Sequence, residues 1–115
     1  MTGAILKIND DKSIELRYTA KRAEKLEKLL DCGLVQGLAQ SDRVGVLVKY
    51  VSCGADITED EAYTAYDELI ENGGSMSDVS DAIIEALQNG GYIPKKAVEA
   101  AKKLEAKLRH ETPQS

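Results

Sequence analysis

Few side chains in this sequence combine a reactive type with a spacing that chemistry needs. His110 is the only histidine, and nothing places near it the orienting partner and pocket that a general base requires. Cys32 and Cys53 each precede a glycine that we expect to end a helix, where the dipole disfavours a thiolate. A zinc site needs four ligands, and these three side chains are scattered. We therefore expect reduced, partly buried thiols, no metal site and no cofactor.

One group of acids is clustered enough to suggest a cation site. It comprises Asp56, Glu59, Asp60 and Glu61. The group lacks the alternating ligands, the glycine turn and the final Glu of an EF-hand loop. Thr58 followed three residues later by Glu61 is instead the pattern of a capping box, so we interpret these acids as the start of a helix.

A second group of acids recurs at spacings of three and four residues, which places its members on one face of a helix. These residues are Asp78, Asp81 and Glu85. Such a carboxylate stripe could meet a basic surface of a partner, or it could be an ordinary solvated face. The chain also lacks a glycine-rich phosphate loop and a nucleophile elbow, so we do not expect an enzyme.

The C-terminal residues 94–115 form a basic amphipathic pattern. Pro94 suits the first turn of a helix, and the residues after Arg109 resemble a frayed tail. This helix could fold back on the acidic middle of the chain, dock on a second copy or a partner helix, or simply be a solvated surface helix. Its narrow, alanine-rich seam argues against a membrane surface. The candidate partner-binding residues are Lys95, Lys96, Lys102, Lys103, Leu104, Lys107, Leu108 and Arg109.

Composition and charge limit the partners further. Apolar residues make up 43% of the chain and aromatic residues only 4%, which favours an aliphatic core over a base-stacking platform. Residues 50–93 carry ten Asp or Glu and no Lys or Arg, so this region would be repelled by a phosphate backbone. No apolar run suits a signal peptide or a membrane span. We therefore expect a cytoplasmic protein that binds neither nucleic acid nor membrane.

Alternating apolar residues predict a hairpin at the N-terminus. Leu6 and Ile8 share one face of a first strand, and Ile14, Leu16 and Tyr18 share one face of a second. The intervening NDDK supplies turn residues. Because a lone two-stranded hairpin is marginal in water, its apolar face needs a helix to cover it.

From Thr19 onward the apolar period lengthens to three or four residues, which predicts helices. Glycines at 33, 54, 73–74 and 90–91 are expected to end them, and their starts are assigned to Thr19, Ser41 or Asp42, Thr58, and Ser75 or Ser77. The second of these segments, which starts at Ser41 or Asp42, is apolar around most of its circumference, so we place it at the centre, although its β-branched residues also suit a strand. The predicted inner faces are Ala23, Leu26, Leu29 and Leu30; Val44, Leu47, Val48 and Val51; Ala62, Tyr63, Tyr66, Leu69 and Ile70; and Val79, Ala82, Ile83, Ala86 and Leu87.

These elements predict one α+β domain, in which a two-stranded antiparallel hairpin packs on a bundle of four to five helices. Residues 1–93 form the hairpin and helical body, and residues 94–115 form the basic C-terminal helix and its frayed tail. At 115 residues the chain has the usual length of a single domain.

The order of these features resembles the small tail assembly chaperones of siphophages and prophages. Those proteins open with a short hairpin, an L-R-aromatic-T element and a helix with an LEK segment, which here are Leu16–Thr19 and Leu26–Lys28. The segments ITEDEAYTAYDELIENGG and DAIIEALQNGGYI are similar to two further helices of that family. The resemblance covers most of residues 5–93, and the basic tail matches no feature of the family.

The resemblance implies a binding function rather than catalysis. Such chaperones keep the long, helical tape measure protein soluble until tail-tube subunits polymerise around it. In many phages a longer, frameshifted form adds a domain that contacts tail-tube subunits, so these are a second implied partner. Self-association into a homo-oligomer stays open. The alternatives are a structural virion component, such as a tail or head–tail connector subunit, and a small cytosolic regulator that binds one protein.

Overall fold

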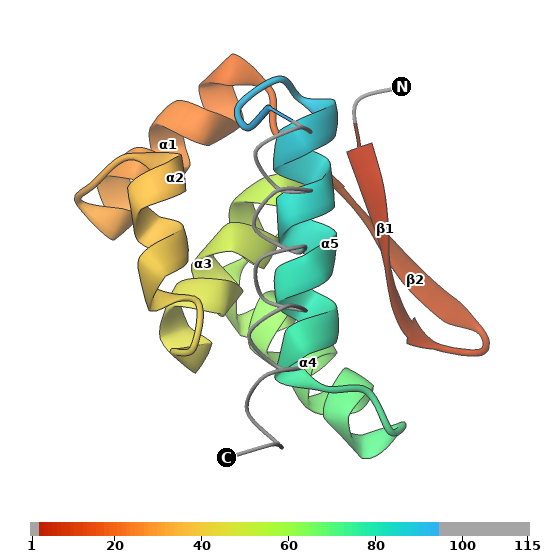
Figure 1. Cartoon of the computed structure of the whole chain (residues 1–115). Helices are drawn as coiled ribbons and strands as arrows, with labels where there is room; N and C mark the ends of the chain where they lie inside the picture. Colours follow the sequence, from red (N-terminus) through yellow and green to blue (C-terminus); the bar gives the residue numbers. More distant parts are fainter. Residues whose placement is uncertain (1–2, 95–115) are drawn as a thin grey trace, which may run out of the picture.

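The computed structural model describes residues 3–94 and places one antiparallel hairpin against five α-helices (Figure 1). This confirms the expected α+β architecture. The predicted C-terminal helix lies outside the described residues. The elements in chain order are β1 (Gly3–Asn9), β2 (Lys12–Arg17), α1 (Ala20–Leu30), α2 (Leu34–Gly37), a 3-10 turn η1 (Leu38–Gln40), α3 (Val44–Ala55), α4 (Glu59–Glu71) and α5 (Met76–Asn89).

The hairpin is closed by the predicted polar turn. The strands pair from Gly3 opposite Arg17 to Asn9 opposite Lys12, with one irregularity in register near the turn. The side chain of Asn9 accepts the backbone N–H of Asp11 at 2.8 Å, which shapes the turn locally. The predicted inward residues Leu6, Ile8, Leu16 and Tyr18 are buried, and Ile14 is partly buried. The hairpin thus contributes one of its faces to the core, packed chiefly against α5 and α3.

Two helix ends differ from the prediction. Helices α1 and α3 stop at Asp31 and Asp56, which have left-handed φ angles of 56° and 58°. Gly33 and Gly54 are therefore not the terminating residues. Aspartate is among the few residues besides glycine that visit this conformation, because its short polar side chain bonds locally. The start of α3 was also wrong, since its N-cap is Arg43, which makes no side-chain capping bond.

The other helix ends follow local capping rules. The Thr19 hydroxyl accepts the N–H of Arg22 and caps α1. Thr58 with Glu61, and Ser75 with Asp78, form complete capping boxes at the starts of α4 and α5. Helix α4 stops at the predicted Asn72-Gly73-Gly74 segment, and α5 at Asn89-Gly90-Gly91. The φ angle is positive at the first glycine of the former, Gly73, and at the second glycine of the latter, Gly91.

Helix α3 is central, as predicted, and it is a helix rather than a strand. It packs against α1, α4, α5 and β2. Leu47, Val48 and Val51 are buried, whereas Val44 at its first turn is exposed. Tyr50, which the apolar stripe did not include, is fully buried. Helix α3 therefore buries the hydroxyl group of Tyr50 as well as aliphatic side chains.

Small residues set the approach of α4. Ala62, Ala65 and Leu69 are buried, whereas Tyr63 and Ile70 are 44% and 43% exposed, so their predicted inward orientation was wrong. Alanines facing α3 allow the two helices to pack closely and turn the large side chains outward. For α5 the whole predicted stripe is buried: Val79, Ala82, Ile83, Ala86 and Leu87.

Three tyrosine hydroxyls connect segments that are distant in the sequence. Tyr50 donates to the backbone carbonyl of Leu34 at 2.5 Å, and Tyr18 donates to the carbonyl of Tyr50 at 2.8 Å. Tyr92, after α5, donates to the carbonyl of Tyr18 at 3.1 Å. Burial raises the pKa of the Tyr18 and Tyr50 hydroxyls, so both remain protonated donors. The chain of bonds ties α2, α3, the end of β2 and the end of α5 together.

The Tyr50 bond can be tested by removing one oxygen. Tyr50→Phe should lower the free energy of unfolding by about 1–3 kcal/mol, because the Leu34 carbonyl loses its partner in a buried place. Urea titration followed by circular dichroism measures the change. Tyr63→Phe is the control, since this exposed hydroxyl makes no hydrogen bond within residues 3–94, and it should cost less than about 0.5 kcal/mol. Equal costs would contradict the role assigned to Tyr50.

Two glycines of α3 give opposite predictions. A Cβ at Gly54 would lie 2.8 Å from Cζ of Tyr18, whereas a Cβ at Gly45 would meet nothing closer than 3.9 Å. Gly54→Ala should destabilise the protein by about 1–3 kcal/mol through overpacking. Gly45→Ala should stabilise it by roughly 0.5–1 kcal/mol through helix propensity. Thermal unfolding of both variants measures the difference, and a stabilising Gly54→Ala would show that Tyr18 does not pack as described.

Candidate interaction surfaces

The candidate partner-binding residues from the sequence cannot be placed, because all of them lie beyond Pro94, outside the described residues. The same holds for His110. The described chain reaches Pro94 shortly after α5, beside Tyr92 and Ile93, which pack against the core. Those residue assignments therefore stay predictions, and the surfaces below are built only from residues 3–94.

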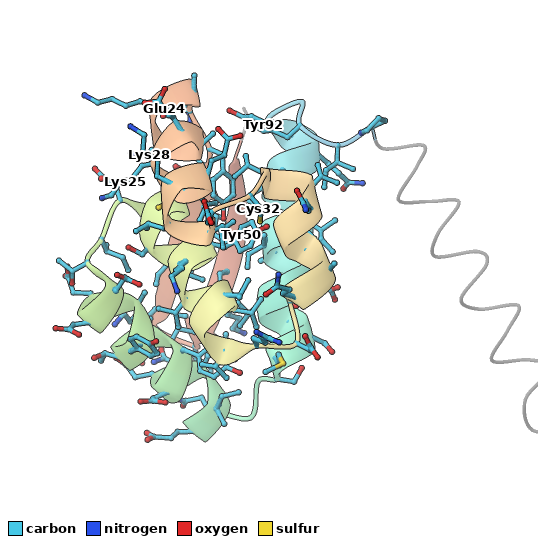
Figure 2. All side chains as sticks on the ribbon, turned by 90° about the vertical axis from the view of Figure 1, so that its left-hand side faces the viewer. Glu24, Lys25, Lys28, Cys32, Tyr50 and Tyr92 are labelled. Carbon is cyan, nitrogen blue, oxygen red and sulfur yellow. The ribbon has the colours of Figure 1, made fainter. Side chains whose placement is uncertain are left out.

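The two thiols are both free, and they differ in their surroundings. Cys53 is buried in α3, and burial is the main cause that raises the pKa of its thiol. Cys32 is half-buried in the connection between α1 and α2. Figure 2 looks onto this face and shows Cys32 and Tyr50 close to the place where α1 and α2 meet. A buried thiol with a raised pKa is a poor nucleophile, so Cys53 serves packing.

Several acids have structural partners. A Glu61 side-chain oxygen accepts the backbone N–H of Thr58 at 3.1 Å, while its own N–H donates to the Thr58 hydroxyl. These two bonds lower the pKa of the Glu61 carboxyl. Asp78 accepts the N–H of Ser75 at 2.8 Å in the same way. Among residues 3–94 no group of three or more His, Cys, Asp or Glu is placed to hold a metal ion. Glu59, Asp60 and Glu61 lie in the first turn of α4, whereas Asp56 ends α3.

Helix α1 presents a basic surface. Lys21, Arg22, Lys25 and Lys28 line a hollow of about 460 Å³ together with Thr19, Glu24 and Asp56. The Arg22 guanidinium also donates to the carbonyls of Arg17 and Gly54, at 3.1 and 3.2 Å. Arg22 therefore joins the hairpin, α1 and the end of α3, while the lysines extend outward. Figure 2 shows Lys25 and Lys28 on this outer side of α1.

Two hollows border α2, and we call the region that they form the α2 face; the surface of the first hollow is mostly apolar and that of the second mostly polar. One hollow of about 270 Å³ lies between α1, α2 and the segment after α5, and another of about 230 Å³ lies between α1, α2 and α3. Val35 in the first hollow is 55% exposed and Leu29 in the second is 38% exposed. The two hollows are lined by Ala23, Glu27, Gly33, Leu34, Val35, Gln36 and Tyr92, and by Leu29, Leu30, Cys32, Gly37, Gln40, Arg43, Val46 and Lys49.

Sequence reasoning did not find the α2 face. The only available signal was the weakly patterned LVQGLAQ segment, which folds as α2 and η1. The backbone of Gly37 in this segment packs directly against the Tyr50 side chain, because a Cβ there would lie 2.5 Å from the Tyr50 hydroxyl oxygen. Val35, two residues before Gly37, is exposed.

The second acid group does share one face, as predicted, and it lies beside the hairpin. Asp78, Asp81 and Glu85 of α5 line a hollow of about 510 Å³ whose opposite wall is β1. The part of this wall that comes from β1 runs from Ile5 to Asp10. The carboxylates, whose residues are all exposed, therefore form one side of a groove that is open to solvent.

Comparison with known proteins adds no family to this geometry. The chain matched no family model, no curated protein and no solved structure. No helix within residues 3–94 has the length and apolar character needed to cross a membrane. Function must therefore be argued from the surfaces and from the sequence patterns.

The Glu61 capping bond predicts a pH effect. The pKa of the Glu61 carboxyl is lower in the folded state than the ordinary glutamate pKa of about 4.3. The capping bond therefore stabilises the fold fully at pH values above that ordinary pKa, and this contribution is lost as the pH falls through the folded pKa. Glu61→Gln should therefore be less stable than the wild type at pH 7 and closer to it at pH 3. Thermal unfolding at the two pH values measures the difference. Thr58→Ser retains both capping bonds and should show no such convergence.

Proposed function

We propose that this protein is a non-enzymatic tail assembly chaperone of a phage or prophage. It binds the tape measure protein in the bacterial cytoplasm and keeps it soluble during tail assembly, with tail-tube subunits as the second partner. The observation that carries the proposal is the ordered likeness of residues 5–93 to that family, from the L-R-aromatic-T element to the two glycine-terminated helices.

The L-R-aromatic-T residues have defined positions in the fold. Leu16 and Tyr18 are buried, Tyr18 bonds to the carbonyl of Tyr50, and Thr19 caps α1. This element forms the junction between the hairpin and the helices. The likeness therefore concerns residues that build this junction, which supports a shared architecture more than a shared contact surface.

The α2 face is the surface that best suits a helical partner. An amphipathic helix binds by placing an apolar stripe into a groove, and the hollow that contains Val35 provides apolar surface of that kind. Figure 2 shows Lys25 and Lys28 on the side of α1 away from α2, where they would favour acidic residues at one end of a partner that extends beyond the α2 face. A binding function without catalysis also agrees with the roles of these side chains in the fold, since Cys53 is buried in the core and Glu61 and Asp78 cap helices.

Co-expression with the tape measure protein of the same phage or prophage tests the proposal. The tape measure protein should be soluble, and should be retained by the tagged protein, only when both are expressed. Val35→Asp should reduce the retained fraction several-fold, because it places a charge in the apolar contact. Ile70→Asp is the matched control, since Ile70 is an exposed apolar residue of α4 away from the α2 face, and it should leave retention unchanged.

The other outcomes separate the alternatives. An insoluble tape measure protein with nothing retained would refute the chaperone proposal. Detection of this protein in purified particles would then favour a structural virion component. Retention that survives Val35→Asp but responds to Ile70→Asp would keep the chaperone function and move its binding surface to α4.

A further inference from the structure

The outer edge of β1 is not paired with another strand within residues 3–94. Within that range the sheet has two strands, so β1 has one edge without a strand partner, and Figure 1 shows β1 beside α5 with β2 on its far side near the turn of the hairpin. Asn89 of α5 donates a side-chain N–H to the carbonyl of Gly3 at 3.0 Å, so this carbonyl points toward α5. Successive residues of an antiparallel strand direct their backbone groups to alternate edges, so the N–H and C=O of Ile5 and Lys7 point the same way.

These backbone groups open into the groove between β1 and α5. Ile5 and Lys7 line it, and their backbones make no hydrogen bond outside the β1–β2 ladder within residues 3–94. The volume of about 510 Å³ is of the size that holds several residues of an extended chain. An edge strand with free donors and acceptors is a template for one more strand.

The acidic wall of the groove, opposite β1, favours a positively charged strand in the groove. Asp78, Asp81 and Glu85 line the wall, and Asp10 lies at its end, with Lys7 as the one cation that lines the groove. Asp81 and Glu85 are four residues apart, which is a rise of about 6 Å along the helix. Side chains on one face of an extended strand repeat every ~6.7 Å, so Lys or Arg at alternate positions would match these carboxylates.

We propose that this groove binds an extended basic segment of a partner protein by strand addition to β1. Lys or Arg at alternate positions faces the carboxylates of α5. The residues between them lie on the other face of the sheet, beside Ile5, whose side chain is 55% exposed. Cross-strand pairing there favours β-branched or aromatic residues. The preferred segment thus alternates basic and β-branched residues, and this preference is separate from the helix-binding α2 face.

The sequence argues against two nearer occupants. In residues 95–115 four of the six cations come in adjacent pairs, Lys95 with Lys96 and Lys102 with Lys103. Lys107 and Arg109 do alternate, so this segment offers one alternating pair to a wall of three carboxylates. A second copy pairing through its own β1 would bring one cation, Lys7, and would set two acidic α5 walls near each other. Both occupants therefore complement the groove less well than a segment with alternating cations.

The test uses the full chain and two fluorescein-labelled peptides of the same composition. Thr-Lys-Val-Lys-Val-Lys-Thr alternates, whereas Thr-Lys-Lys-Val-Thr-Lys-Val has no two lysines at alternate positions. Fluorescence anisotropy should show roughly tenfold tighter binding of the alternating peptide, a difference that bulk charge cannot produce. Amide hydrogen exchange should show new protection at Ile5 and Lys7 when that peptide is bound.

A matched pair of charge variants locates the contact. Asp81→Asn with Glu85→Gln should weaken binding of the alternating peptide roughly tenfold at low salt. Asp67→Asn with Glu71→Gln removes the same charges at the same spacing from an exposed face of α4, and should change binding less than about twofold. Asp78 is left intact because it caps α5.

Three results would overturn the proposal. Equal binding of the two peptides without protection of β1 would mean that only bulk charge is recognised. Protection of Ile5 and Lys7 in the free protein, lost in Lys107→Glu with Arg109→Glu, would assign the groove to the chain's own C-terminal segment. Protection that rises with protein concentration alone would assign it to a second copy.

Discussion

The buried hydroxyl of Tyr50 is the constraint on which the arrangement of the helices depends. Helix α2 has four residues and cannot be stable by itself, so its position must come from tertiary contacts. The hydrogen bond from Tyr50 to Leu34 and the burial of Leu34 supply them. Since Tyr18 also bonds to the carbonyl of Tyr50, the hairpin and α2 are positioned against the same residue of α3. Within residues 3–94 no buried side-chain polar atom lacks a partner, so these hydroxyls stabilise the core instead of straining it.

Patterns among neighbouring residues predicted the strands and helices, whereas the features that the sequence analysis missed depend on packing between segments that are distant in the chain. Alternation and capping patterns are written in neighbouring residues, which is why the hairpin, the capping boxes of α4 and α5, and the stripe of α5 were predictable. Gly54 was interpreted as a helix stop because glycine usually marks one, whereas its actual role is to leave room for the Tyr18 ring. The burial of Tyr50 could not be read from α3 alone, because its partner Leu34 lies sixteen residues earlier.

The same distinction between local patterns and non-local packing applies to the candidate sites. The carboxylates of α5 were predicted to share a face, since their spacing is a property of one helix. That this face forms a groove depends on β1, which is some seventy residues away in the chain and is held beside α5 by Asn89. The α2 face was missed for a related reason, because an exposed valine in a short segment carries no periodic signal. The basic C-terminal residues were chosen from composition, and the described structure leaves that choice a prediction.

The acidic wall beside β1 also bears on how the protein avoids pairing with itself. A free strand edge invites any extended chain, including the same strand of another copy. In a two-fold pairing through β1, each copy would place Asp81 and Glu85 near the same residues of its partner, and like charges in a groove raise the free energy of the complex. The charge that disfavours self-pairing is the charge that favours an incoming basic strand. A single set of carboxylates therefore protects the edge and selects its partner, which requires that β1 and α5 stay in the fixed relation that Tyr18, Tyr92 and Asn89 impose.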